Sequence, residues 1–182
     1  MKKISVYFFA FVALLMFATS CTKDNHKAGP DAPDVPKTTM PDAYVGYWMA
    51  GTFDMSTFWN YDGTRQDDAT SMIAYAIKKD GSAEQFIYYD YNDGSDKQSL
   101  TYRKGTVTFD AATNTLKFCP AQGSFRTFEN GTKTEGAMNA QGLFPAYAPA
   151  YPNCTFDEQN NTTYLVSTDS QNETIGFAKT SW

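Results

Sequence analysis

Three aromatic residues, Phe58, Trp59 and Tyr61, lie in a stretch of the chain that is otherwise rich in amides and charged groups. Their polar neighbours are Asn60, Asp62, Arg65, Asp67 and Asp68. Sugar rings have apolar faces and hydroxyl-bearing edges, so an exposed aromatic plane beside carboxylates and amides is suited to binding a carbohydrate. A β-barrel interior also needs aromatic side chains. The pattern therefore leaves two interpretations open, a ligand-binding patch and a part of the core.

The residues that usually carry catalysis are missing from the region expected to fold. The single histidine, His26, lies in a polar N-terminal segment, so no Ser-His or Cys-His nucleophile pair is expected in the domain. The chain also has no Gly-x-Ser-x-Gly sequence and no phosphate-binding glycine loop. A carboxylate pair of the glycosidase kind stays open, because separation along the chain does not determine separation in space. We expect a protein that is not an enzyme and that needs no cofactor.

Residues 90–96 have the oxygen-rich composition of a calcium-binding loop. An EF-hand loop, however, needs glycine at its sixth position and a closing glutamate. Here Gly94 is the fifth residue, and no glutamate closes the loop. Zinc is also disfavoured, since the chain has no Cys-x-x-Cys pair and His26 is its only histidine. We expect a hairpin turn at 90–96 and no metal site.

The N-terminus has the features of an export signal. Lys2 and Lys3 form a basic start, an apolar run occupies residues 4–18, and small residues precede Cys21. This order is typical of a secretory signal peptide covering residues 1–20. The apolar run is too short to span a bilayer, which takes roughly 20 residues.

The four residues Ala18-Thr19-Ser20-Cys21 resemble the bacterial lipobox, in the looser form found in Bacteroidetes-type lipoproteins. The resemblance implies that the Cys21 thiol receives a diacylglycerol, that the chain is cut before Cys21, and that its new amino group is acylated, for example with palmitate. Two or more acyl chains hold a protein stably on a membrane. The resemblance thus implies an outer-membrane lipoprotein facing the cell surface or the periplasm. The alternative is a plain secretory signal with a chance cysteine.

Two cysteines remain beyond the lipid anchor, Cys119 and Cys154. Export places them in an oxidising compartment, where an even pair of cysteines usually forms a disulfide. We expect a Cys119–Cys154 bond, with two buried free thiols as the alternative.

The charge of the chain disfavours a nucleic-acid partner. Of 15 basic residues, Lys2 and Lys3 leave with the signal peptide, so 13 remain against 20 acidic residues, a net charge of −7. Such a surface repels phosphate backbones and gives no attraction to anionic lipid. Contact with the membrane should come from the acyl chains of Cys21 alone.

The remaining chain divides into a linker and one domain. Residues 21–42 are polar and rich in proline, which favours an extended, flexible segment. Residues 43–182 have a high aromatic content and many short alternating runs, which favours strands. The expected strands cover 71–78, 83–91, 99–102, 106–109, 116–118, 125–128, 164–167 and 174–178, and the clearest hairpin is at 79–82.

Two-residue turn signals and one long irregular segment complete the pattern. Asp62-Gly63, Asp80-Gly81, Asp93-Gly94 and Asn130-Gly131 are dipeptides suited to tight hairpins. Residues 132–161, with three prolines, are expected to form a long loop. Such a loop is often functional, although it could simply cover a sheet edge or a barrel mouth. Many short strands at this spacing predict an all-β fold built as an antiparallel meander, a barrel or alternatively a β-sandwich.

Gly46-Tyr47-Trp48, at the first strand after the linker, resembles the Gly-x-Trp motif of the lipocalin-like families. The resemblance covers roughly residues 44–182 and implies an up-and-down β-barrel in which Trp48 plugs the closed end. In typical members an arginine packs on this tryptophan, but no counterpart can be assigned from the sequence. Gly46 and Trp48 are thus structural in this resemblance and bind no ligand.

Two functional hypotheses follow. The first is a lipid-anchored envelope protein that binds a small hydrophobic or carbohydrate ligand, either in a barrel cavity above roughly 300 Å³ or on an exposed platform at Phe58, Trp59 and Tyr61. The second is a structural or accessory subunit of an envelope assembly. It predicts a packed interior and an exposed apolar patch, for which 144–151 is a candidate.

Overall fold

The computed structural model describes residues 37–66, 69–91, 96–143 and 150–182. Within these ranges the chain forms ten strands and three short helical segments. The strands are β1 (Gly46–Ala50), β2 (Met72–Ile77), β3 (Ser82–Tyr91), β4 (Lys97–Asp110), β5 (Thr115–Glu129), β6 (Thr132–Ala137), β7 (Ala150–Tyr151), β8 (Thr155–Gln159), β9 (Thr162–Thr168) and β10 (Thr174–Thr180). The helical segments are η1 (Asp42–Tyr44), η2 (Met55–Asn60) and α1 (Ala140–Leu143).

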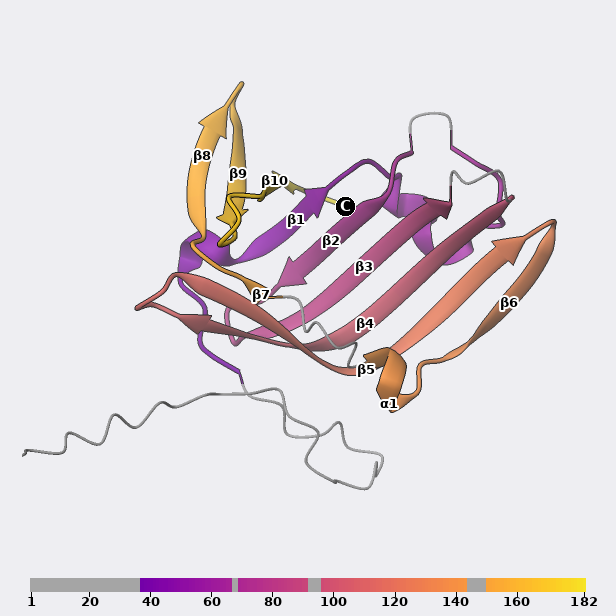
Figure 1. Cartoon of the computed structure of the whole chain (residues 1–182), viewed down its shortest axis with the longest axis horizontal. Helices are drawn as coiled ribbons and strands as arrows, with labels where there is room; N and C mark the ends of the chain where they lie inside the picture. The colour runs from indigo at the N-terminus through magenta and orange to yellow at the C-terminus, as the bar shows by residue number, and fades with distance from the viewer. Residues whose placement is uncertain (1–36, 67–68, 92–95, 144–149) are drawn as a thin grey trace, which may run out of the picture.

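All ten strands belong to one antiparallel sheet, and nine of them follow the order β6-β5-β4-β3-β2-β1-β10-β9-β8 (Figure 1). The short strand β7 adds to β5 through the pair Leu116 and Tyr151. Neighbours in the sheet are mostly neighbours in sequence, as in a meander. The predicted all-β, antiparallel fold is therefore confirmed. Among the described strands the sheet is not closed, because β6 and β8 each have a partner on one side only.

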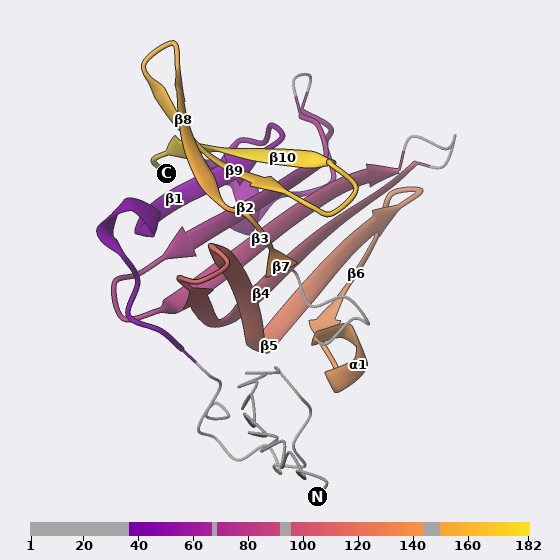
Figure 2. The ribbon, with the colours of Figure 1, turned by 60° about the vertical axis from the view of Figure 1, so that its left-hand side comes forward.

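The sheet curls so that its two ends approach each other over a first core. Figure 2 shows β7 to β10 lying in front of the central strands. Leu165 of β9 and Phe177 of β10 belong to the same buried cluster as Phe118 of β5. Tyr151 joins the two ends, with its ring centroid 5.1 Å from that of Phe177. We call the face that holds this cluster the concave face.

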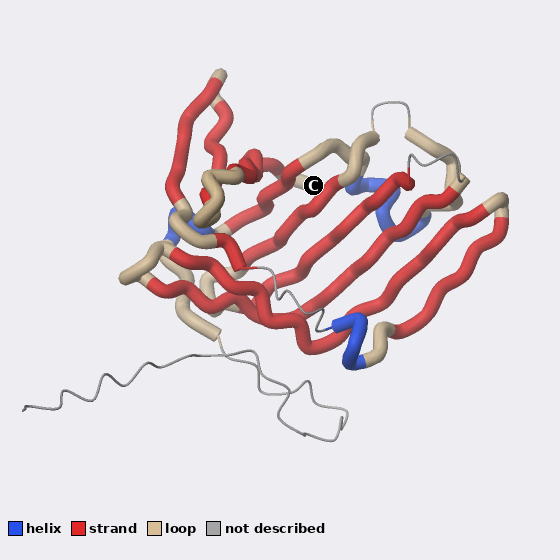
Figure 3. The backbone as a smooth tube through the Cα atoms, viewed as in Figure 1, coloured by secondary structure: helices blue, strands red, loops and turns tan. Residues whose placement is uncertain are grey.

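A second core covers the opposite, convex face of the same sheet. The connection between β1 and β2 crosses this face and carries η2, which lies behind the sheet in Figure 3. Among the described residues, strands supply six of the ten buried members of this core and the connection supplies four. Its buried members are Phe53, Met55, Phe58, Tyr61, Met72, Ala74, Phe86, Tyr88, Leu100 and Phe128. Because both faces are covered, β2 is apolar at every position, with Ile73, Tyr75 and Ile77 on the concave side.

Several predicted turns are present. Residues 79–81 form the β2–β3 hairpin, closed by a 2.9 Å bond from the N–H of Lys78 to the carbonyl of Ser82. Gly81 has a φ of 82°, which suits glycine. Asn130 and Gly131, with φ of 50° and 74°, turn β5 into β6 as a type I′ hairpin requires. The predicted turn at Asp93-Gly94 lies outside the described residues.

Three sequence-based assignments are wrong in part. Asp62-Gly63 forms no tight hairpin, because it lies within the long connection that covers the convex face. Residues 132–161 are not one loop, since β6, α1, β7 and β8 lie within them. The expected linker also ends earlier than residue 42, because Met40 is fully buried in the concave core and its N–H donates to the carbonyl of Lys79.

The predicted Cys119–Cys154 disulfide is wrong. Cys154 is a buried free thiol. Its backbone N–H donates to the carbonyl of Asn114 at 2.8 Å, five residues before Cys119 on the same stretch of chain. Five strand residues span roughly 16 Å, whereas the Cα atoms of a disulfide lie less than about 7 Å apart. The pairing of β7 with the start of β5 thus sets Cys154 too far from Cys119.

The Cys154 thiol should be unreactive in the native protein. It donates to the carbonyl of Tyr151 at 3.1 Å, and burial raises its pKa, so little thiolate is present near neutral pH. We expect iodoacetamide at neutral pH to label Cys154 only after unfolding in guanidinium chloride. The mass of the proteolytic peptide that contains Cys154 measures this, and rapid labelling of the native protein would contradict the buried position.

No helix in the described part of the chain is long and apolar enough to cross a membrane.

Candidate aromatic binding platform

The three aromatic residues singled out from the sequence do not share one environment. Phe58 and Tyr61 are buried in the convex core, whereas Trp59 is 57% exposed. The reason is the 3₁₀ geometry of η2, in which residues three apart lie on the same side. Met55, Phe58 and Tyr61 follow that spacing and face the sheet. Trp59 falls between them and remains at the surface.

Polar contacts hold η2, and with it Trp59, in a defined position. At its start, the Asp54 carboxylate accepts hydrogen bonds from the N–H and the hydroxyl of Ser56, at 3.0 and 2.7 Å. At its end, the Arg126 guanidinium of β5 donates to the carbonyl of Trp59 at 2.8 Å and to the carbonyl of Phe58. The same guanidinium lies 5.6 Å from the centre of the Phe58 ring. Arg126 thus occupies the carbonyls that would otherwise end η2 without partners.

Trp59 belongs to a connected row of aromatic rings on the convex face. It packs edge-on against Tyr102 of β4 at 4.9 Å and against Phe86 of β3 at 6.2 Å. Trp182 also contacts Phe86, at 6.0 Å, and in turn contacts Tyr47 of β1 at 4.7 Å. We call these five residues the aromatic platform.

The outer members of the aromatic platform are open to solvent. Trp59, Trp182 and Tyr47 are 57%, 38% and 39% exposed, and Tyr102 is half-buried. Phe86 lies beneath them and is buried. Large exposed aromatic groups gathered in one place on a soluble domain mark binding surfaces more often than scattered ones do.

A carboxylate lies at the edge of the aromatic platform. Glu84 of β3 accepts a hydrogen bond from the Tyr102 hydroxyl. Burial, together with the negative charge and the hydrogen bond of Glu84, raises the pKa of Tyr102 to about 12. A phenol with a raised pKa keeps its proton at neutral pH, so the Tyr102 hydroxyl remains a hydrogen-bond donor there. The platform therefore combines ring faces with hydroxyl and carboxylate groups.

Two surface grooves adjoin the tryptophans at the ends of the platform. A groove of about 290 Å³ lies beside Trp182 and is lined by Met49, Phe53, Asp54, Met55, Ser56, Thr180 and Ser181. A groove of about 360 Å³ lies beside Trp59 and is lined by Ser124, Phe125, Arg126, Lys133, Glu135 and Gly136. The aromatic platform thus continues at both ends into hollows with mixed apolar and polar walls.

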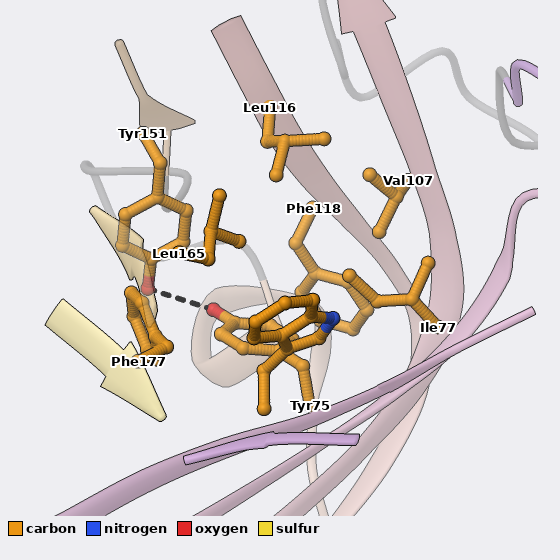
Figure 4. A pocket seen from close by; sticks show the side chains of 9 residues that line it. Tyr75, Ile77, Val107, Leu116, Phe118, Tyr151, Leu165 and Phe177 are labelled. Carbon is orange, nitrogen blue, oxygen red and sulfur yellow. Dashed lines mark hydrogen bonds between the residues drawn. The ribbon is translucent and has the colours of Figure 1, made fainter. Parts of the chain in front are cut away.

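The cavity that the described residues form in the concave core is, in contrast, too small for a ligand. It measures about 20 Å³ and is lined by apolar and aromatic side chains (Figure 4). Binding cavities for small molecules usually measure 300 Å³ or more. The Tyr75 hydroxyl at its edge is bonded to that of Tyr151 at 2.8 Å and accepts from the amide of Gln85. Burial raises the pKa of Tyr75 well above its usual value.

Trp48 is a core residue and does not belong to the aromatic platform. It is fully buried in the concave core, and its indole N–H donates to the carbonyl of Tyr44 at 2.9 Å. The ammonium group of Lys179 lies 5.4 Å from the centre of its ring. Gly46, two residues earlier, has a φ of 131°, a conformation that side-chain-bearing residues rarely adopt.

The sequence pointed to one member of the platform, Trp59, and missed the others. Tyr47, Phe86, Tyr102 and Trp182 come from four separate segments, so no local spacing links them. Within the described residues, no group of three or more histidine, cysteine, aspartate or glutamate residues is placed to hold a metal ion. Comparison of the chain with protein-family models, with curated proteins and with solved structures found no match.

Proposed function

We propose that this protein is a lipid-anchored envelope protein that binds glycans on the aromatic platform. The observation that carries the proposal is the position of Trp59, whose backbone carbonyl accepts a hydrogen bond from Arg126 and whose exposed ring packs against Tyr102. Tryptophan side chains are on average largely buried in folded proteins. Here the surrounding structure maintains it at the surface.

The platform has the chemistry that a sugar ring needs. Ring faces bury the apolar face of a sugar, and the hydroxyl of Tyr102 and the carboxylate of Glu84 can bond to its hydroxyl edge. Aromatic side chains have few rotatable bonds, so little conformational entropy is lost on binding. The packed concave core favours this surface over a barrel cavity as the binding site.

Removal of the Trp59 side chain tests the proposal. On a glycan array, the purified protein should bind a subset of carbohydrates, and Trp59→Ala should lower the affinity for them at least tenfold, about 1.4 kcal/mol. Tyr89→Ala is the matched control, because Tyr89 is another largely exposed aromatic residue (46%) and lies on the concave side of β3. Equal binding by the Trp59 variant, or loss in the Tyr89 variant, would place the site elsewhere.

The proposed membrane anchor is Cys21, which lies outside the described residues. Its support is the signal-like segment and the lipobox resemblance at 18–21. The intact mass of the protein purified from its native membrane should correspond to a chain that starts at Cys21 and carries acyl groups. A retained Met1, or an unmodified Cys21 thiol, would refute the anchor.

We also propose that the domain is related to the lipocalin-like barrels in an opened form. Two features support this relationship. Trp48 lies buried in the first strand behind Gly46, and a basic side chain, that of Lys179, lies over its ring. The free edges at β6 and β8 are the difference from a closed barrel.

The second candidate is an accessory subunit of an envelope assembly, favoured by the outer edge of the sheet. All five residues of β8 are exposed, and in the described part of the chain only β9 pairs with it. An unpaired edge strand can accept a strand from another protein. Because the 144–149 part of the apolar patch expected for this role lies outside the described residues, β8 is the better test. Asp157→Pro should abolish such an association in pull-downs from envelope extracts while the glycan binding remains.

A further inference from the structure

We infer that the platform accommodates an extended, neutral glycan chain that contacts both tryptophans, rather than a single terminal sugar. This inference rests on the proposed function and specifies its ligand. It places Trp182 in the site beside Trp59 and assigns to Arg126 the role of a positioning residue.

The first argument is geometric. Trp59 and Trp182 both contact Phe86 of β3, at 6.2 and 6.0 Å between centroids. Trp59 also packs on Tyr102 of β4 and Trp182 on Tyr47 of β1, and β4 and β1 lie on opposite sides of β3 in the sheet. Each tryptophan also borders its own groove, of about 360 and 290 Å³. One sugar ring covers one aromatic face, so it can use only one of the two tryptophans. A chain of sugars can stack on both and continue into the grooves.

The second argument concerns charge. Two cations line the groove beside Trp59, and both are engaged: Arg126 with the carbonyls at the end of η2, and Lys133 with Glu135 at 2.7 Å. The groove beside Trp182 contains Asp54 and the hydroxyl groups of Ser56, Thr180 and Ser181. Glu84 adds a further carboxylate beside Tyr102. Hydroxyl-rich walls with carboxylates and engaged cations favour neutral sugars over uronates or sulfated sugars.

The third argument concerns the position of Trp59. Arg126 touches the backbone of Phe58 and Trp59 rather than the open ring face, so it acts on the ligand through Trp59. Its pKa is lowered by burial, yet it stays charged at neutral pH, as an arginine does in proteins. Arg126→Lys keeps the charge and Arg126→Met removes it. The lysine variant should retain most of the binding.

Isothermal titration calorimetry with oligosaccharides of increasing length tests the inference. The probes are neutral oligomers of glucose and of mannose, from the monosaccharide to the hexasaccharide, and oligogalacturonides of the same lengths. For at least one neutral series, the affinity should rise at least tenfold between the disaccharide and the hexasaccharide. Trp59→Ala and Trp182→Ala should each lower hexasaccharide affinity at least tenfold, and Tyr89→Ala should leave it unchanged.

The possible results separate the inference from the function on which it rests. If monosaccharides bind as tightly as hexasaccharides, or if Trp182→Ala has no effect, the site takes a terminal sugar and the inference is wrong while glycan binding stands. Stronger binding of oligogalacturonides, weakened by salt, would overturn the neutral charge preference. If neither these series nor any glycan of the array binds, both the inference and the proposed function fail. Near-UV circular dichroism confirms that each variant is folded.

Discussion

Replacement of Trp48 by alanine should lower the free energy of unfolding by about 3–5 kcal/mol. Trp48 has no exposed surface, and its indole N–H is bonded to the carbonyl of Tyr44. The substitution therefore leaves a cavity in the concave core and a buried carbonyl without its donor. Since small domains are stable by only about 5–15 kcal/mol, this loss is a large part of the total.

Trp59→Ala is the matched control for Trp48→Ala, because the same side chain is removed from an exposed position. It should cost less than about 1 kcal/mol, as surface substitutions usually do. Urea unfolding followed by far-UV circular dichroism measures both variants without using tryptophan fluorescence. If Trp48→Ala does not fold, Trp48→Phe retains most of the ring and should cost less. Equal stability of the two alanine variants would show that Trp48 is not a core residue.

Gly105→Ala should be strongly destabilising for so small a substitution, with a cost of roughly 3 kcal/mol. A Cβ atom at Gly105 would lie 2.0 Å from the carbonyl oxygen of Cys119 and 2.7 Å from the Cα of Pro120. Both are backbone atoms of the neighbouring strand, so no side-chain rotation can relieve the contact. The position coincides with the register shift between Lys104 and Gly105, where β4 bends against β5.

Gly176→Ala serves as the control for Gly105→Ala. Gly176 lies in β10, and a Cβ atom there would meet its nearest neighbour, a ring carbon of Tyr164, at 3.9 Å, an ordinary contact. Alanine in a strand loses less backbone entropy on folding than glycine, so this variant should be neutral or slightly more stable. Thermal unfolding of the two variants side by side gives the comparison. A Gly105→Ala protein that is as stable as Gly176→Ala would contradict the close strand packing at the bend.

The strands and hairpins could be predicted because they depend on local patterns. Alternation and turn dipeptides identified β2, β3 and the hairpin between them. The same reasoning divided β4 into 99–102 and 106–109, two runs that lie on either side of Gly105. In the structure this glycine bends one continuous strand rather than ending it. Local patterns locate the irregularity but do not show whether the chain continues through it.

The arrangement of the cores depended on information that is not local. Residues 51–71 look like polar loop and hairpin, yet they bury Phe53, Met55, Phe58 and Tyr61 on the convex face. A spacing of three from Met55 to Tyr61 was the available signal, and it distinguishes the buried rings from Trp59. The partners of Trp59 in the platform come from β1, β3, β4 and the segment after β10. Their proximity follows from the sheet order, which the sequence does not state.

The cysteines show that the compartment does not determine which cysteines can pair. Export predicts an oxidising environment, in which Cys119 and Cys154 would be expected to pair. The pairing of β7 with the start of β5 instead seats Cys154 against Asn114 and Tyr151. A pairing prediction from composition alone cannot include strand register, which decides whether two sulfur atoms can meet.

The most direct measurement of the platform uses the three tryptophans as separate reporters. In a nitrogen-15 NMR titration with a neutral hexasaccharide, each indole N–H gives one signal, and Trp48→Phe, Trp59→Ala and Trp182→Ala assign them. The signals of Trp59 and Trp182 should shift together as ligand is added. The signal of Trp48, whose N–H is bonded to the carbonyl of Tyr44 in the opposite core, should remain in place. A titration that moves only the Trp48 signal, or that leaves the Trp59 and Trp182 signals unmoved at saturating ligand, would contradict glycan binding on the aromatic platform.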